Sequence, residues 1–207
     1  MNRKTFVASQ LMKAGALQVR TEAPFTWSSG IQSPIYCDNR ILMSFPKVRK
    51  NITAYFAEVI SNQYPETDII AGCATAGIPH AAWVADQLEL PMVYVRGKAK
   101  AHGKQNQIEG NLSKGQKVIV IEDLVSTGMS VLNAAKTIER SGGEVMAMLS
   151  IFTYGLTASL KNFKSARIRY ESLTDFDTLL SHMNHNKQIS QQQKEDLLKW
   201  RDHLSIS

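Results

Sequence analysis

From about residue 65 onward, short apolar runs alternate with helical stretches, and this alternation constrains the fold more than any other feature. Four apolar runs predict buried strands: residues 67–73, 92–95, 117–121 and 144–154. Helices are predicted between them, over residues 78–90 and from about 130 to 140. Because parallel strands need crossover helices, the pattern predicts an α/β fold, a mostly parallel sheet flanked by helices on both faces.

The two ends of the chain have a different character. The apolar positions of the first residues predict an amphipathic helix that ends near Gly15, and a longer helix is expected at about residues 46–63. Two helices are predicted near the C-terminus. One starts near Thr174, and the other follows Ser190, with Gln193 placed to complete a capping box.

The composition is that of an ordinary globular protein, with 43% hydrophobic and 20% charged residues among 207. This length suits a single domain of residues 1–207, and we expect a small hood, formed mainly by about residues 1–45 with part of the C-terminal region. The sequence has no run of about 18 apolar residues and no signal-peptide pattern, so no membrane partner is expected. Cys37 and Cys73, the two cysteines, lie in apolar runs and favour a cytoplasmic, reduced protein.

The formal net charge of +6 indicates an anionic partner, which could be nucleic acid, an acidic membrane surface or a small polyphosphate. The basic residues are scattered, apart from one local cluster at residues 96–104. The sequence has no basic stripe with interleaved aromatic residues, so we expect no nucleic acid. The motifs decide between the remaining partners.

The segment after the clearest strand is suited to bind a phosphate group. Residues 122–130, EDLVSTGMS, join that strand to a helix. Where a strand, a small-residue turn and a helix N-terminus meet, free N–H groups and the helix dipole form an anion site. Hydroxyl groups of Ser126, Thr127 and Ser130 can add to it, and Gly128 lets the backbone approach closely. The alternative is an ordinary turn with a Ser or Thr N-cap.

An acidic pair, Glu122 and Asp123, precedes this turn. Two carboxylates repel a bare polyphosphate but accept hydrogen bonds from adjacent ribose hydroxyl groups, so the segment fits a ribose 5-phosphate. Four apolar residues followed by Glu-Asp-x-x-Ser-Thr-Gly-x-Ser resemble the phosphoribosyl pyrophosphate (PRPP) motif of type I phosphoribosyltransferases. The resemblance implies the fold of that family and PRPP binding by Glu122, Asp123, Leu124, Val125, Ser126, Thr127, Gly128, Met129 and Ser130.

Two further segments resemble orotate phosphoribosyltransferases. Residues 25–40, FTWSSGIQSPIYCDNR, are similar to the N-terminal segment of that family; the alternative is a plain hairpin. Residues 96–110 resemble the family's mobile lid loop, which implies PRPP binding by Arg96, Lys100 and His102. Cations brought in by such a loop stabilise the departing pyrophosphate, and His102 could donate a proton. The alternative is a solvated basic loop.

Residues 71–79 match the family's pyrophosphate loop in position, although a packed glycine turn at a helix start remains an alternative. Ser126 matches the position that hydrogen-bonds orotate in the family. Ser28 and residues 152–156 stand where many relatives carry a Lys and an Arg-containing segment. These departures resemble the Gram-positive type of the enzyme, and they leave the ligand of the orotate carboxylate unassigned.

The resemblance implies transfer of the 5-phosphoribosyl group from PRPP to orotate, giving orotidine 5'-monophosphate and pyrophosphate, in de novo pyrimidine (UMP) biosynthesis. It implies catalytic roles for Lys100, His102 and Asp123, with Mg²⁺ held mainly by substrate oxygens and water rather than by a protein metal site. It also implies a homodimer whose lid loop acts at the neighbouring site. The alternatives are a phosphoribosyltransferase for another base, and a PRPP-sensing regulator of the same fold that binds nucleic acid.

Overall fold

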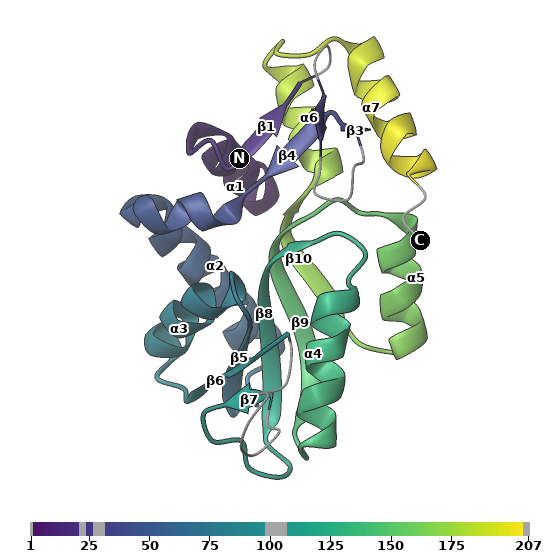
Figure 1. Cartoon of the computed structure of the whole chain (residues 1–207). Helices are drawn as coiled ribbons and strands as arrows, with labels where there is room; N and C mark the ends of the chain where they lie inside the picture. Colours follow the sequence, from purple (N-terminus) through teal and green to yellow (C-terminus); the bar gives the residue numbers. More distant parts are fainter. Residues whose placement is uncertain (1, 21–23, 27–31, 98–106, 205–207) are drawn as a thin grey trace.

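The computed structural model describes residues 2–20, 24–26, 32–97 and 107–204. Its central feature is a sheet with the strand order β10-β9-β8-β5-β6-β7 (Figure 1). Neighbouring strands are parallel, except for the antiparallel pair β6 and β7. The strands are β5 (Ile69–Cys73), β6 (Met92–Val95), β7 (Ile108–Glu109), β8 (Lys117–Val125), β9 (Glu144–Thr153) and β10 (Tyr170–Asp175).

Helices cover both faces of this sheet. On one side lie α2 (Pro46–Gln63) and α3 (Gly77–Leu88), and on the other lie α4 (Met129–Arg140) and α5 (Thr157–Ala166) (Figure 1). The buried side chains form two clusters that correspond to the two faces. On β8, Ile119 and Ile121 belong to the cluster with α2 and α3, whereas Val118 and Val120 belong to the cluster with α4. The predicted α/β architecture is confirmed.

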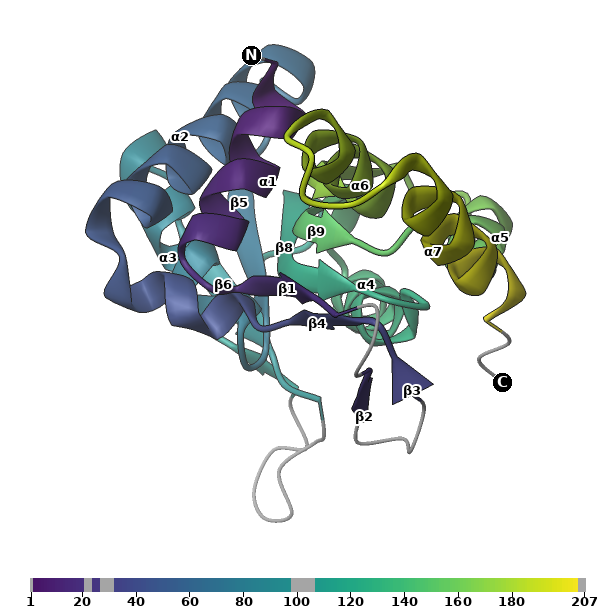
Figure 2. The same ribbon diagram turned by 90° about the horizontal axis from the view of Figure 1, so that it is seen from above.

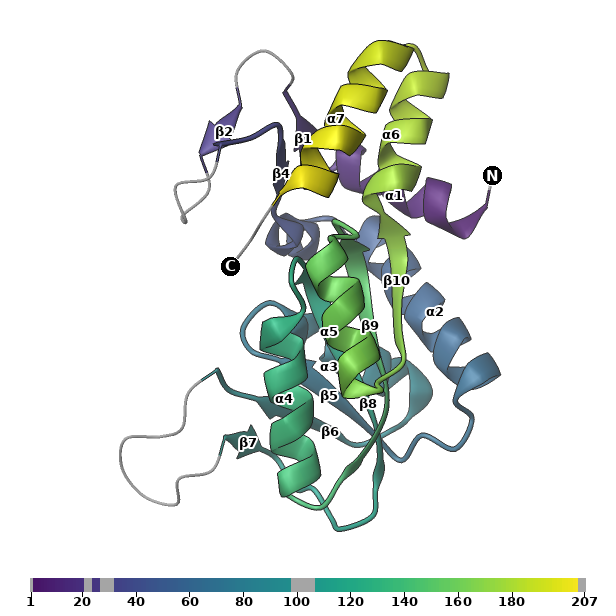
Figure 3. The same cartoon turned by 90° about the vertical axis from the view of Figure 1, so that its right-hand side faces the viewer.

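The remaining elements gather above one end of the sheet (Figures 2 and 3). They come from both ends of the chain. The two ends are held together by contacts of α1 with β10 and α6, and of α6 with α7. We call this group the hood. Its elements are α1 (Arg3–Lys13), β1 (Leu17–Val19), β2 (Phe25–Thr26), β3 (Gln32–Ser33), β4 (Ile35–Cys37), the 3-10 helix η1 (Asn39–Ser44), α6 (Phe176–His185) and α7 (Gln191–His203). None of the helices that the structure describes is long and apolar enough to cross a membrane.

Most predicted elements are present with boundaries shifted by one or two residues. The helix predicted at 46–63 is α2, and the capping box of Ser190 and Gln193 starts α7. Asp175 caps α6 by accepting a hydrogen bond from the Thr178 amide at 2.8 Å. The prediction that KVIVI alone forms the strand was wrong, because β8 continues to Val125. The extension is stabilised by pairing with β9, in which Val125 lies opposite Thr153.

Strand β10 and helix α5 were not predicted from the sequence. The sequence of β10, YESLTD, lacks the apolar run of a buried strand. Two of its polar side chains bond to β9: the Ser150 hydroxyl lies 2.7 Å from the Tyr170 hydroxyl and 3.1 Å from the Ser172 hydroxyl. Hydrogen bonds across the strands therefore replace the apolar pattern that sequence analysis relies on.

Helix α3 approaches the end of β8 so closely that its first residue must be glycine. A Cβ atom on Gly77 would lie 2.5 Å from the carbonyl oxygen of Ile121 and 3.3 Å from the Cα of Glu122. Both of those atoms belong to the backbone of a strand that is paired on both sides, so neither can move away easily.

We predict that Gly77→Ala lowers the free energy of unfolding by about 1–3 kcal/mol, because the added methyl group overlaps backbone atoms of β8. Urea unfolding followed by circular dichroism would measure this. The matched control is Gly97→Ala, since a Cβ atom there meets no atom within 4 Å. Equal stability of the two variants would contradict the prediction.

Candidate active site

The acidic pair Glu122 and Asp123 lies within β8, near its carboxyl end, rather than in a turn after the strand. Pairing of β5 with β8 ends at Gly72 opposite Ile121, so the two carboxyl groups emerge just where the neighbouring strand stops. In parallel sheets this edge is where ligands bind, because the loops that follow the strands meet there.

A cavity of about 390 Å³ opens at this edge. Three parts of the chain line it: the end of β4 with the start of η1, the loop between β5 and α3, and the end of β8 with the start of α4. Its lining residues are Cys37, Asp38, Arg40, Ala74, Thr75, Ala76, Glu122, Asp123, Leu124 and Ser130. The cavity therefore brings together the predicted acidic pair, part of the predicted phosphate turn and the predicted pyrophosphate loop.

The two carboxyl groups are held in a poorly solvated environment. Glu122 is 7% exposed, and its Oε1 accepts a hydrogen bond from the Asp123 amide at 3.0 Å. Burial, followed by repulsion from Asp123, raises the pKa of Glu122 to about 9. Burial also raises the pKa of Asp123. Ionisation of this pair is therefore disfavoured unless hydrogen-bond donors or a cation compensate its charge, and ribose hydroxyl groups are such donors.

The predicted phosphate turn leads into the N-terminus of α4. Gly128 precedes this helix with φ +80°, and a Cβ atom there would lie 2.9 Å from the Phe163 ring. The Thr127 carbonyl accepts a hydrogen bond from the side chain of Asn162 of α5 at 3.0 Å, and this bond stabilises the turn. Ser126 and Thr127 are partly exposed, whereas Met129 and Ser130 are exposed.

Six of the predicted PRPP ligands that the structure describes are not among the residues that line the cavity: Arg96, Val125, Ser126, Thr127, Gly128 and Met129. Val125 is 2% exposed and belongs to the apolar cluster beneath α4. Arg96 follows β6, and its Nη1 lies 3.5 Å from Oε1 of Glu109 on β7, outside the residues that line the cavity. Lys100 and His102, predicted for the lid, and Ser28 lie outside the described residues.

The residues of η1 that approach β8 received no individual role from the sequence. Asn39 is fully buried, and its Nδ2 donates to the carbonyl oxygen of Asp123 at 2.8 Å. Asp38 and Arg40 form an ion pair at 2.7 Å on either side of it. The only signal in the sequence was their place at the end of the segment that resembles the family, since contacts over 84 positions leave no local pattern.

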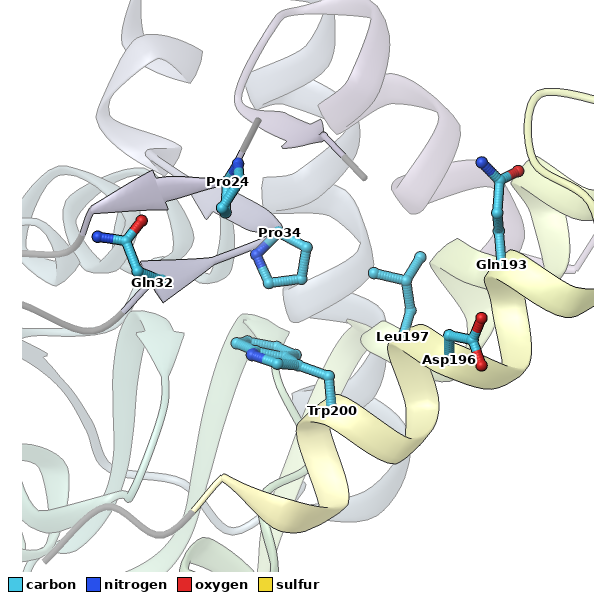
Figure 4. A pocket seen from close by; sticks show the side chains of 7 residues that line it. All are labelled: Pro24, Gln32, Pro34, Gln193, Asp196, Leu197 and Trp200. Carbon is cyan, nitrogen blue, oxygen red and sulfur yellow. The ribbon is translucent and has the colours of Figure 1, made fainter. Parts of the chain in front are cut away.

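A second hollow, of about 520 Å³, lies within the hood between α7 and the β2–β3 segment (Figure 4). Trp200 and Leu197 of α7 face Pro34 across it. Gln32, Gln193 and Asp196 are the polar residues among those that line it, and none of the predicted site residues is present. The cavity beside β8 is therefore the candidate active site.

Comparison with known proteins identifies the class of this fold and site. The family model of the phosphoribosyl transferase domain matches residues 41–174, which include the sheet strands β5 to β9 and the acidic pair. The chain is a phosphoribosyltransferase with the type I fold.

Curated relatives narrow the class. The orotate phosphoribosyltransferase of Oceanobacillus iheyensis is 50% identical over 204 residues, which are 99% of this chain and 100% of the relative. That of Listeria innocua is 50% identical over 200 residues, 97% of this chain and 96% of the relative. The chain belongs to the orotate phosphoribosyltransferase family. Among solved structures, the orotate phosphoribosyltransferase of Aeropyrum pernix superposes with a TM-score of 0.76 at 29% identity, covering 86% of this chain and 98% of that one.

We predict that Glu122→Gln stabilises the fold increasingly as the pH rises from 5 to 9. The unfolded Glu loses its proton near its ordinary pKa of about 4.3, while the folded one keeps it up to about 9. Between these values only the unfolded state releases a proton, so stability falls as the pH rises, and glutamine removes this loss. Urea unfolding of both proteins at several pH values measures the difference; a difference that stays constant with pH would show the prediction to be wrong.

Proposed function

We propose that the chain transfers the 5-phosphoribosyl group of PRPP to orotate, giving orotidine 5'-monophosphate and pyrophosphate, in de novo pyrimidine biosynthesis. One observation carries this proposal: the acidic pair of β8, the start of α4 and the β5–α3 loop line one cavity. The relatives that are 50% identical to this chain over nearly its full length support the same activity.

In the proposed site, residues 126–130 hold the 5-phosphate with backbone N–H groups and hydroxyl groups at the N-terminus of α4. Glu122 and Asp123 accept hydrogen bonds from the ribose hydroxyl groups. The backbone of Ala74, Thr75 and Ala76 faces the pyrophosphate from the β5–α3 loop. Ser126 serves orotate from the same turn, which agrees with its partly exposed position.

The proposed reaction needs no covalent intermediate with the protein. The bond from C1 of the ribose to pyrophosphate breaks as positive charge develops at C1, and the lone pair of the base nitrogen forms the new bond from the opposite face. The chain contributes by positioning the two substrates and by stabilising charge in a poorly solvated site. Asp123, which is less solvated than a surface carboxylate, is placed to stabilise the ribose as it becomes cationic.

The lid and the dimer complete the proposal. Arg96, Lys100 and His102 act on the pyrophosphate as it leaves, and the lid serves the neighbouring site of a homodimer. We further propose that residues 1–207 act as one domain with its hood, and that the protein works in the cytoplasm, where its two free cysteines stay reduced.

Mg²⁺ is the proposed cofactor. No group of three or more His, Cys, Asp or Glu side chains that could hold a metal ion occurs in the described part of the chain. The pair of Glu122 and Asp123 still suits a nearby hard cation that takes its ligands mainly from phosphate oxygens and water. Since each carboxyl group has a raised pKa, a nearby cation would relieve their repulsion. When bound, the ion neutralises charge on the pyrophosphate.

We predict that the purified chain consumes orotate in the presence of PRPP and Mg²⁺, and that Lys100→Ala slows this reaction by about 10²-fold or more, because a cation is lost from the leaving group. Ultraviolet absorbance of orotate measures the rate. Lys114→Ala is the control, since this lysine lies in the β7–β8 connection outside the proposed site. Reaction with another base would correct the substrate alone, whereas no reaction with any base would favour a PRPP-sensing regulator.

Removal of the metal is a separate test. We predict that excess EDTA abolishes orotate consumption and that added Mg²⁺ restores it, because phosphate charge at the cavity is then no longer neutralised. Circular dichroism with and without EDTA should be unchanged, since no described residue cluster forms a structural metal site. Undiminished turnover in EDTA would contradict the role of the ion.

A further inference from the structure

The charge of the cavity poses a problem for an anionic base. Three carboxyl groups line it, from Asp38, Glu122 and Asp123, and orotate carries a carboxylate of its own. Among the described residues that line the cavity, Arg40 is the one cation. An anion that enters this space is therefore repelled by any of these carboxyl groups that is ionised, and Arg40 is the lining side chain that can attract it.

Arg40 is held with one edge of its guanidinium group occupied. Its Nε donates to Oδ1 of Asp38 at 2.7 Å, and its Nη2 donates to Oδ2 at 2.8 Å. This bidentate pair uses the Nε–Nη2 edge. The other edge, formed by Nη1 and the second N–H of Nη2, donates no hydrogen bond to any residue that the structure describes. That edge has the geometry for a second carboxylate.

The backbone around Arg40 is fixed from two sides. Asp38 caps η1 by accepting a hydrogen bond from the Arg40 amide at 3.1 Å, so the same carboxylate orients both the helix and the guanidinium group. Asn39 joins this turn to the carbonyl oxygen of Asp123 at 2.8 Å. Arg40 is therefore anchored to the strand end that carries the ribose-binding pair, although its side chain remains 63% exposed and open to a ligand.

The segment that would be the other candidate for this role points into the core. Residues 152–156 contain no cation, and Phe152 and Tyr154 are 0% and 4% exposed. Their rings pack edge to face at 5.4 Å. Burial raises the pKa of the Tyr154 hydroxyl, so this group stays neutral. A neutral, buried phenol compensates a carboxylate far less than an open guanidinium edge does.

We propose that Arg40, oriented by Asp38, binds the carboxylate of orotate and so determines which base the site accepts. This inference rests on the proposed function, because it assigns the base-carboxylate ligand of that same site. The carboxylate of orotate lies beside the ring nitrogen that bonds to C1. A guanidinium group anchored next to Asp123 thus both neutralises the base and orients its nitrogen towards the ribose.

Steady-state kinetics with two bases test the proposal. Arg40→Gln is expected to raise KM for orotate at least about tenfold, the effect of losing a charged hydrogen-bonded partner, while KM for PRPP changes less than about twofold. The preference for orotate over uracil, which has no carboxylate, should fall by a similar factor in kcat/KM. Arg40→Lys should give intermediate values, since it keeps the charge but loses the bidentate edge. Arg140→Gln, at the exposed end of α4, is the control.

Each other outcome counts against the proposal. A rise in KM for PRPP with an unchanged preference between orotate and uracil would assign Arg40 to PRPP. Unchanged kinetics would make the Asp38–Arg40 pair structural only. If thermal unfolding shows that Arg40→Gln is not folded, the base preference of folded Arg40→Lys decides, and an unaltered preference overturns the inference. If the unsubstituted chain leaves orotate untouched but ribosylates uracil, the proposed substrate fails and this inference fails with it.

Discussion

Two adjacent carboxyl groups at the end of a strand in the middle of the sheet are the constraint on which this structure depends. Glu122 and Asp123 follow Ile121, the last residue of β8 that pairs with β5. They therefore lie at the edge of the sheet, just beyond its apolar layers. Burial there still raises the pKa of both groups. The sheet thus keeps at its edge a poorly solvated acidic pair whose ionised form a ligand or an ion would stabilise.

The surrounding elements are arranged to keep this pair accessible yet poorly solvated. Gly77 lets α3 approach the backbone of Ile121 and Glu122, and it thereby places the β5–α3 loop against the pair. On the other side, Asn39 of the hood reaches the carbonyl oxygen of Asp123. The β5–α3 loop and the end of β8 meet because parallel strands present their following loops at one edge, and the hood adds Asn39 by packing on that edge.

The local patterns made most of the fold predictable, together with half of the site. Apolar runs predicted β5, β6, β8 and β9, and the capping box predicted the start of α7. Strand β10 was not predicted because the hydroxyl group of its buried Ser172 is accommodated by hydrogen bonds, which leave no apolar pattern in the sequence. The extension of β8 was missed for a related reason, since only pairing with β9 keeps two acidic residues in a strand.

The sequence by itself determined the alternation of β5, β6, β8 and β9 with helices, and the acidic pair followed by a phosphate turn, because these are properties of neighbouring residues and of the periods of regular structure. Only the tertiary structure decided that Asn39 bonds to Asp123 and that Arg40 stands open at the same cavity. Such contacts join residues more than 80 positions apart. Their geometry depends on how the hood packs on the sheet edge, which no local pattern encodes.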